Sequence, residues 1–148
     1  MTTIYGVERS VKSNSLVVAD TDALIALTLE EDIHHERAKK ISLELLSKGA
    51  VIIFPVTVFP ETITFFKRAL NQAEKAHKIN NQLQSGKFIV EYIDEQILKR
   101  ATYYFDKANS KKNTFFDAIV AATAENLEAE AIFSFDDWYP KLGFKLAG

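Results

Sequence analysis

Short apolar runs alternate with longer amphipathic segments along most of the chain. Four runs are rich in β-branched and aromatic residues and are bounded by polar or turn-forming positions, which is typical of buried strands. These runs are residues 16–19, 50–54, 88–93 and 131–135. A fifth run, residues 144–147, is short enough to predict an edge strand.

The segments between the runs have helical periodicity. Apolar residues recur every three or four positions in residues 59–70 and 97–108, so each segment has one apolar stripe. Residues 115–127 are apolar on nearly every side, as in a deeply packed helix, whereas residues 33–48 and 73–85 have one polar face. Strands alternating with helices predict an α/β domain with a mainly parallel sheet. Ligands of such folds bind beyond the carboxyl ends of the strands, where helix N-termini also lie.

The composition is that of an ordinary soluble domain. The chain has 148 residues, of which 47% are hydrophobic and 26% charged, enough for one domain with a real core. The net charge of -2 argues against a surface that is basic throughout, although it leaves room for a local basic groove. The chain has no cysteine, which excludes disulfides, thiolate zinc sites and a cysteine nucleophile.

The lengths of the apolar runs and the composition of the N-terminal segment also indicate where in the cell we expect the protein. No run approaches the ~20 residues that a membrane-spanning helix needs. The N-terminal segment lacks the continuous apolar stretch of a secretory signal, so we expect a cytoplasmic protein without a membrane partner. Residues 1–14 are polar and predict a flexible N-terminal arm, followed by a single domain over residues 15–148.

Four predicted elements each place a carboxylate at the same edge of the sheet. Repulsion within such a cluster must be relieved by protonation, by basic partners or by a cation. No basic residue is interleaved with these acids, and oxygen-only ligands suit Mg²⁺ or Mn²⁺, so we predict one or two such ions. The acids are Asp20 after the first strand, Glu61 in the helix after the second, Asp117 at the start of the buried helix, and Asp136 after the fourth strand.

Each of these acids also has a purely structural interpretation. Asp20 could cap the helix that follows it, and Asp117 could complete a capping box that begins at Thr114. Glu61 could simply be favoured by a helix N-terminus, and Asp136 with Asp137 could form a solvated turn. The coincidence of all four at one edge favours a joint site.

The order and spacing of these motifs resemble those of PIN-domain proteins, and most of all the VapC-type toxins of toxin–antitoxin pairs. The resemblance rests on VVADTDALIAL, on the acid in PVTVFPETITFFKRAL, and on FFDAIVAATAENLEAEAIFSFDDW, and it extends over about residues 15–147. It implies a three-layer α/β/α sandwich with a mainly parallel central sheet. It also implies a Mg²⁺- or Mn²⁺-dependent endoribonuclease, in which a water attacks an RNA phosphodiester. The catalytic and metal-binding acids would be Asp20, Glu61, Asp117 and Asp136.

The resemblance implies supporting residues and partners as well. Ser134 stands at the family's Thr/Ser position of the last motif, and Asp137 is a second acid beside Asp136. Asp22 stands where the family often has Ser or Asn, so its charge could hold a second ion or repel phosphate. The implied partners are an RNA substrate, an antitoxin protein that covers the active-site edge, and a second copy of the chain in a homodimer.

Binding to RNA requires local positive charge despite the net charge of the chain. Candidate basic residues gather just before Asp117, where they could contact phosphates or merely form solvated helix faces. They are Arg100, Lys107, Lys111 and Lys112.

Two other functions compete with the nuclease hypothesis. A haloacid-dehalogenase-like phosphatase would use Asp20 as nucleophile and Asp22 as general acid, but it leaves Glu61 and Asp117 unexplained. A non-catalytic interaction module would keep the fold and bind no metal. Loss of activity on Glu61→Gln would separate the nuclease from the phosphatase, and metal binding would separate it from the module.

Overall fold

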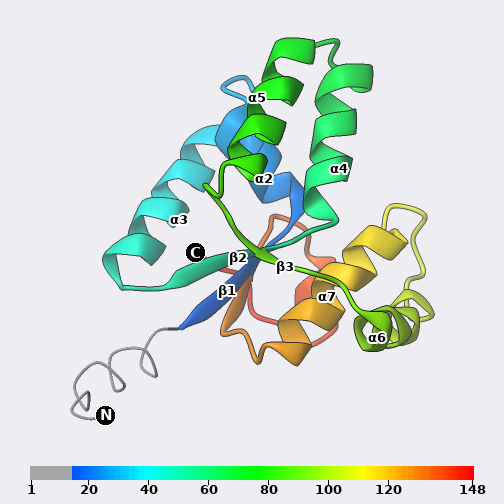
Figure 1. Cartoon of the computed structure of the whole chain (residues 1–148). Coiled ribbons are helices and arrows are strands. Elements are labelled where there is room, and N and C mark those ends of the chain that lie inside the picture. Colours follow the sequence, from blue (N-terminus) through cyan, green and yellow to red (C-terminus); the bar gives the residue numbers. More distant parts are fainter. Residues whose placement is uncertain (1–14) are drawn as a thin grey trace.

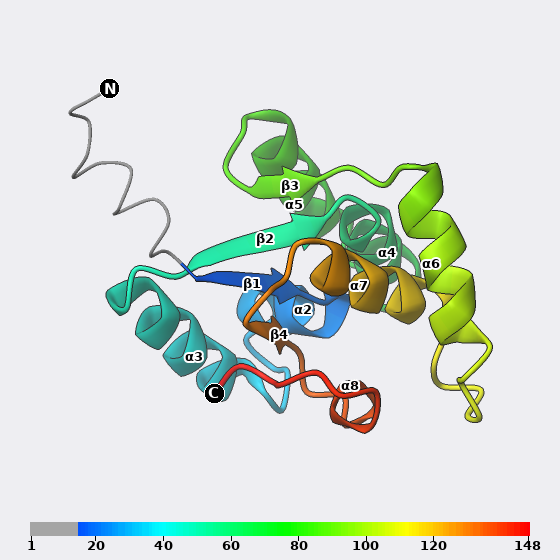
Figure 2. The same ribbon diagram turned by 90° about the horizontal axis from the view of Figure 1, so that it is seen from below.

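The structure, a computed structural model, describes residues 15–148 (Figure 1). Its centre is a sheet of four parallel strands in the order β3-β2-β1-β4, all labelled in Figure 2. The prediction of an α/β domain with a parallel sheet is confirmed. The arm predicted for residues 1–14 lies outside the described residues. The strands are β1 (Leu16–Ala19), β2 (Val51–Pro55), β3 (Ile89–Glu91) and β4 (Ala131–Phe133).

Helices cover both faces of the sheet and make the predicted three-layer α/β/α sandwich. In Figure 1, α2 to α5 lie on one side of the sheet and α6 and α7 on the other. Figure 2 shows α7 directly across the strands, with α6 packed on its outer side. Within residues 15–148, no helix is long and apolar enough to cross a bilayer. The helices are α2 (Thr21–Thr28), α3 (His35–Ser47), α4 (Val58–Thr64), the π-helical turn η1 (Phe65–Ala69), α5 (Ala73–Gln84), α6 (Glu95–Phe105), α7 (Phe115–Asn126) and α8 (Trp138–Lys141).

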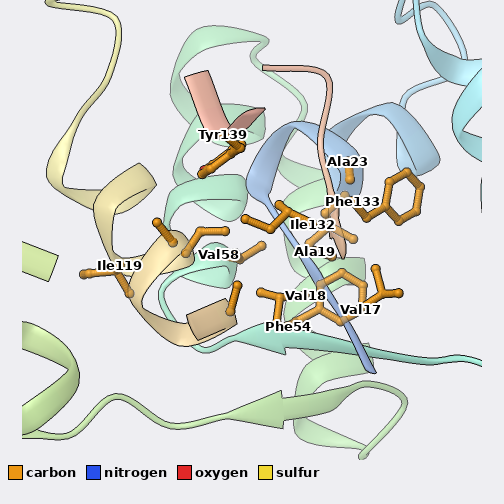
Figure 3. Close-up of a cluster of buried hydrophobic side chains, with 14 of the residues drawn as sticks. Val17, Val18, Ala19, Ala23, Phe54, Val58, Ile119, Ile132, Phe133 and Tyr139 are labelled. Atoms are coloured by element: carbon orange, nitrogen blue, oxygen red, sulfur yellow. The ribbon is translucent and has the colours of Figure 1, made fainter. Parts of the chain in front are cut away.

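The core forms where α7 crosses the central strands. Val17 and Val18 in β1 are completely buried because helices cover both faces of this strand, which explains its unbroken apolar run. Alanines on α7, such as Ala118 and Ala121, allow the helix to approach the sheet closely. Figure 3 shows side chains of this cluster from β1, β4 and α7, among them Val17, Ile132 and Ile119, with the ring of Tyr139 at the border of the cluster.

Three predicted elements differ from the structure. The run at 88–93 is a short edge strand and not a buried one, and Ile89 in this strand is 55% exposed. The run at 144–147 forms only one isolated bridge, between Leu146 and Ile132. The helix predicted over 59–70 passes into a π turn after Thr64.

The π turn keeps the apolar stripe of that segment facing the core. Its wider spacing is visible in the bond from Leu70 N to Phe65 O, five residues apart. Phe66 is completely buried, whereas Lys67 and Arg68 remain exposed.

Candidate functional site

The first acid follows β1 directly and is locked by local hydrogen bonds. The backbone N–H of Asp20 donates to Phe133 O of β4 at 3.0 Å, which continues the ladder between the two strands. Its Oδ1 accepts from Thr21 N at 2.6 Å, so Asp20 does cap α2, as the structural interpretation expected. The side chain is nevertheless buried, with 4% of its surface exposed. A helix cap alone does not require such burial.

The second acid is linked to the first through a threonine. Glu61 lies in the first turn of α4, and Thr21 Oγ1 donates to its Oε1. Thr21 is therefore bonded on one side to Asp20 and on the other to Glu61. This contact joins the N-terminal turns of α2 and α4 at the carboxyl edge of the sheet.

The third acid opens α7, where Thr114 and Asp117 form the predicted capping box. Asp117 Oδ2 accepts from Thr114 N at 2.9 Å. The cap fixes the side chain on the first turn of the helix, at the same edge as Asp20. The structural interpretation of Asp117 is thus correct, and it also explains how the carboxylate is positioned.

The fourth acid is held by two donors from different segments. Asp136 Oδ2 accepts from Asn113 Nδ2 at 3.0 Å, and its Oδ1 accepts from Trp138 N at 2.9 Å. Asn113 is 9% exposed and comes from the connection between α6 and α7. The sequence alone did not identify Asn113 as a site residue. The only local signal for it is its position just before the capping box that begins at Thr114.

The serine of the last motif joins this acid to Asp22. Ser134 Oγ donates to Asp22 Oδ2 at 2.9 Å and accepts from Asp136 N at 3.1 Å. Phe135 N also donates to Asp22 Oδ2, at 2.8 Å. Asp22 therefore anchors the segment after β4, and its Oδ1 is buried without a hydrogen-bond partner among the described residues. Asp137, by contrast, is exposed and lies 3.9 Å from Lys141 Nζ.

A buried tyrosine completes the site, and sequence reasoning did not identify it. Tyr139 in α8 is completely buried, and its hydroxyl donates to Asp20 Oδ2 at 2.7 Å. The same hydroxyl lies 3.4 Å from the backbone oxygen of Asp117. Its only sequence signal is its place three residues after Asp136.

The carboxylates of the site disfavour one another's charges. Burial raises the pKa of Asp20 well above its usual range, and the charges of Asp22 and Asp117 raise it further. Burial also raises the pKa of Asp22 and that of Glu61. The pKa of Asp117 is raised to about 6, mainly by burial and then by the charges of Glu61, Asp136 and Asp22.

No basic side chain relieves this repulsion within residues 15–148. The four ion pairs found there involve acids outside the cluster or at its exposed rim, namely Glu36, Glu95, Glu125 and Asp137. The cluster must therefore take up protons or a cation to lower its charge.

The donor set suits a divalent cation, although no ready-made cage is present. Among residues 15–148, no three acidic or histidine side chains converge closely enough to form a metal-binding group. The hydrogen bonds described above hold the carboxylates individually. All the donors are oxygens, the acids lack basic partners, and Asp22 leaves a buried oxygen unpaired. These features fit Mg²⁺ or Mn²⁺, which prefer hard oxygen ligands and retain several waters.

The predicted basic residues fall into two groups. Arg100 donates to both carboxylate oxygens of Glu125, at 2.6 and 3.0 Å, so its charge is already compensated on the outer side of α6 and α7. Lys111 and Lys112 are exposed on the connection between α6 and α7. Lys107 lines a cleft of about 360 Å³ between this connection and α8, together with Asn109, Ser110, Asn113, Trp138, Lys141 and Leu142.

This cleft adjoins the fourth acid. Asn113 and Trp138, which line it, are also the two residues that donate to Asp136. The cleft brings in Lys141, which sequence reasoning had not singled out. The hydroxyl, amide and ammonium groups that line the cleft make the cleft a polar extension of the acidic edge.

Comparison with known proteins identifies the family and the fold of the chain. The profile of the PIN-domain family matches residues 17–145, so the chain belongs to the PIN-domain family, as its motifs indicated. Among solved structures, it is similar to VapC20 of Mycobacterium tuberculosis, described as a toxin that cleaves the sarcin-ricin loop. The TM-score is 0.74 and the sequence identity 22%, and the match covers 86% of this chain and 95% of VapC20. At this identity the likeness is one of fold. No curated protein matches the chain.

Proposed function

We propose that this protein is a divalent-metal-dependent endoribonuclease of the VapC type. Its metal-binding and catalytic acids would be Asp20, Glu61, Asp117 and Asp136. One observation carries the proposal: four separate elements bring these carboxylates to one edge, where burial raises the pKa of at least three of them without a basic partner. Membership of the PIN-domain family and the fold shared with VapC20, described as a toxin that cleaves the sarcin-ricin loop, support it.

The residues of the site would divide the work of binding and orientation. A bound divalent ion supplies positive charge that offsets the charge developing on the phosphate and eases the deprotonation of water. Thr21 would orient Glu61, Thr114 would orient Asp117, and Ser134 with Asp22 would set the segment that carries Asp136. As the water oxygen bonds to phosphorus, the P–O bond to one of the two ribose oxygens would break. The proton lost by the water would pass to a site carboxylate or to solvent, and the departing ribose oxygen would take up a proton from solvent.

The substrate strand would pass over the cleft beside Asp136. Lys107 and Lys141 line this cleft, and Lys111 and Lys112 lie on the adjoining connection. We propose that these lysines contact RNA phosphates on one side of the cleaved bond. Arg100 is left out of this set because Glu125 already binds its guanidinium.

The proposal is tested by incubating the purified protein with end-labelled single-stranded RNA in EDTA, Mg²⁺ or Mn²⁺. We expect internal cleavage with either metal, none in EDTA, and loss of cleavage on Asp117→Asn. Glu95→Gln is the matched control, because Glu95 is an exposed acid in the first turn of α6. Equal cleavage by wild type and Asp117→Asn would contradict the assignment.

The same samples separate the two competing functions. A phosphatase would release phosphate from a small phosphomonoester, whereas the proposed nuclease would leave this compound intact. A non-catalytic module would show no rise in melting temperature with Mn²⁺, whereas an acidic metal site is stabilised by mass action.

We also propose that a protein partner, an antitoxin, covers the acidic edge and continues along the surface of α3, whose start reaches that edge because the His34 ring stacks on Phe135. Leu43 and Leu46 lie one helical turn apart and are 66% and 59% exposed, and Ile33 just before the helix is 91% exposed. A nuclease inhibited by such a partner would act in the cytoplasm, where it would meet its RNA.

Light scattering of the purified chain tests the predicted homodimer directly.

A further inference from the structure

The buried tyrosine of α8 contacts the most deeply buried acid of the site. Its hydroxyl donates to Asp20 Oδ2 at 2.7 Å and lies 3.4 Å from Asp117 O. One hydroxyl group thus sits where the end of β1, the first turn of α7 and α8 meet. The ring borders the core cluster of β1, β4 and α7 (Figure 3).

Packing alone does not explain this hydroxyl. A phenylalanine ring would fill the same apolar space without bringing a polar group into the interior, where an unpaired hydroxyl is costly. Here the hydroxyl pairs with a carboxylate that is itself 4% exposed. A phenol has an ordinary pKa of about 10, so at neutral pH it is a neutral donor.

A neutral donor has a specific advantage at a cation site. A lysine or arginine in the same place would also stabilise Asp20, but its charge would repel a divalent ion. A phenol fixes the carboxylate through a short hydrogen bond and leaves the negative charge available. Outer hydrogen-bond partners of this kind orient metal ligands and tune their affinity.

We propose that Tyr139 is a positioning residue that holds Asp20 in the orientation needed to bind the divalent ion. This inference rests on the proposed function, because it assumes that Asp20 is a metal ligand. The same short helix also orients Asp136, through Trp138 N at 2.9 Å. Helix α8 would therefore set two acids at once, one from β1 and one from the segment after β4.

The chain offers a matched control for the test. Tyr104 is also buried, 6% exposed, and its hydroxyl donates to a carboxylate, Glu125 Oε1, at 3.1 Å, outside the acidic cluster. Tyr139→Phe and Tyr104→Phe each remove one hydroxyl that bonds a carboxylate. Only the first change removes a bond to a proposed metal ligand.

The experiment measures Mn²⁺ binding by the electron paramagnetic resonance signal of the free ion, for wild type and both variants. Loss of an outer-shell partner typically lowers metal affinity by about 10–100-fold. We expect a drop of that size in Tyr139→Phe and less than about twofold in Tyr104→Phe. With RNA, the Tyr139→Phe variant should show a lower kcat at limiting Mn²⁺, an unchanged KM for RNA, and recovery at high Mn²⁺.

The possible outcomes are distinct. Mn²⁺ affinity of Tyr139→Phe within about twofold of wild type would overturn the inference and leave the proposed function intact. Absence of Mn²⁺ binding by the wild type would overturn the proposed function and the inference together. If Tyr139→Phe does not fold, wild-type protein carrying ¹³C at the tyrosine ζ-carbons replaces it. Mg²⁺ should then shift the resonance of the buried Tyr139, and an unshifted resonance would refute the inference.

Discussion

Replacing Asp117 by asparagine should stabilise the metal-free protein at neutral pH, although the same change should abolish cleavage. The carboxylate lies in a cluster of like charges, and burial raises its pKa from 3.8 to about 6. Asparagine keeps an oxygen that can accept from Thr114 N, so the cap of α7 is retained. The variant therefore removes a repulsive charge and little else.

The size of the effect follows from the pKa shift. One pKa unit corresponds to about 1.4 kcal/mol, so a shift of roughly two units would correspond to about 3 kcal/mol. The carboxylate is partly exposed, and solvent screening reduces the expected gain to about 1–2 kcal/mol. For a domain of this size, that is a rise in Tm of roughly 2–8 °C.

The sign depends on pH in a defined window. The folded state binds the proton of Asp117 more tightly than the unfolded state, so wild-type stability falls as pH rises from 3.8 through about 6. Below this window residue 117 is neutral in the wild type and in Asp117→Asn, so the two proteins should be equally stable. Above the window Asp117→Asn should be the more stable protein. Mg²⁺ at about 100 times its Kd would add about 2.7 kcal/mol to the wild type and should reverse the order.

Thermal unfolding followed by circular dichroism measures this effect in EDTA at pH 4, near the lower end of the window where the difference should be small, in EDTA at pH 8, and at pH 8 in excess Mg²⁺. Asp106→Asn serves as the control, because Asp106 is an exposed acid at the end of α6. A wild type as stable as Asp117→Asn at pH 8 in EDTA would refute the reasoning. So would a difference of the same size at both pH values.

Three further changes test other parts of the account. Glu61→Gln should lower the rate of RNA cleavage by more than the roughly 10–100-fold expected when a hydrogen-bond partner of a metal ligand is lost. The control Glu95→Gln should cleave at the wild-type rate in the same gel assay. The double variant Lys107→Gln/Lys141→Gln should weaken RNA binding. It should also reduce the slope of log K against log salt by up to about 1.4, because each phosphate contact on a single strand contributes about 0.7. An unchanged slope would exclude the cleft as a binding surface. Phe59→Ala should destabilise the fold by about 3–5 kcal/mol in a urea titration, because this ring is completely buried between Phe54 and Phe88; a loss below about 1 kcal/mol would contradict the described core.

Local sequence patterns predicted the elements that carry the acids. The apolar run of β1 ends at Asp20, and the capping box from Thr114 to Asp117 marks the start of α7. Both signals lie within a few residues, and the parallel arrangement then brings the strand ends together. This is why the edge that holds the four acids could be predicted without the structure.

The remaining features depend on contacts between distant segments. Ser134 and Asp22 are 112 positions apart, and Tyr139 and Asp20 are 119 apart, so no periodicity links them. Ile89 is 55% exposed in a strand at the edge of the sheet, and the composition of the strand does not reveal its place in the sheet. The π turn at Phe65–Ala69 lies between α4 and α5, which pack side by side, and helical periodicity in the sequence does not reveal it.

The central claim is that an ion held by the acidic cluster drives RNA cleavage. Its most direct test measures, on one preparation, the initial rate of RNA cleavage and the binding of Mn²⁺ as functions of Mn²⁺ concentration. We predict that both half-saturate at the same concentration and that both are lost on Asp20→Asn. Cleavage that persists in EDTA, or that reaches half its maximum where the site is still empty, would contradict the account.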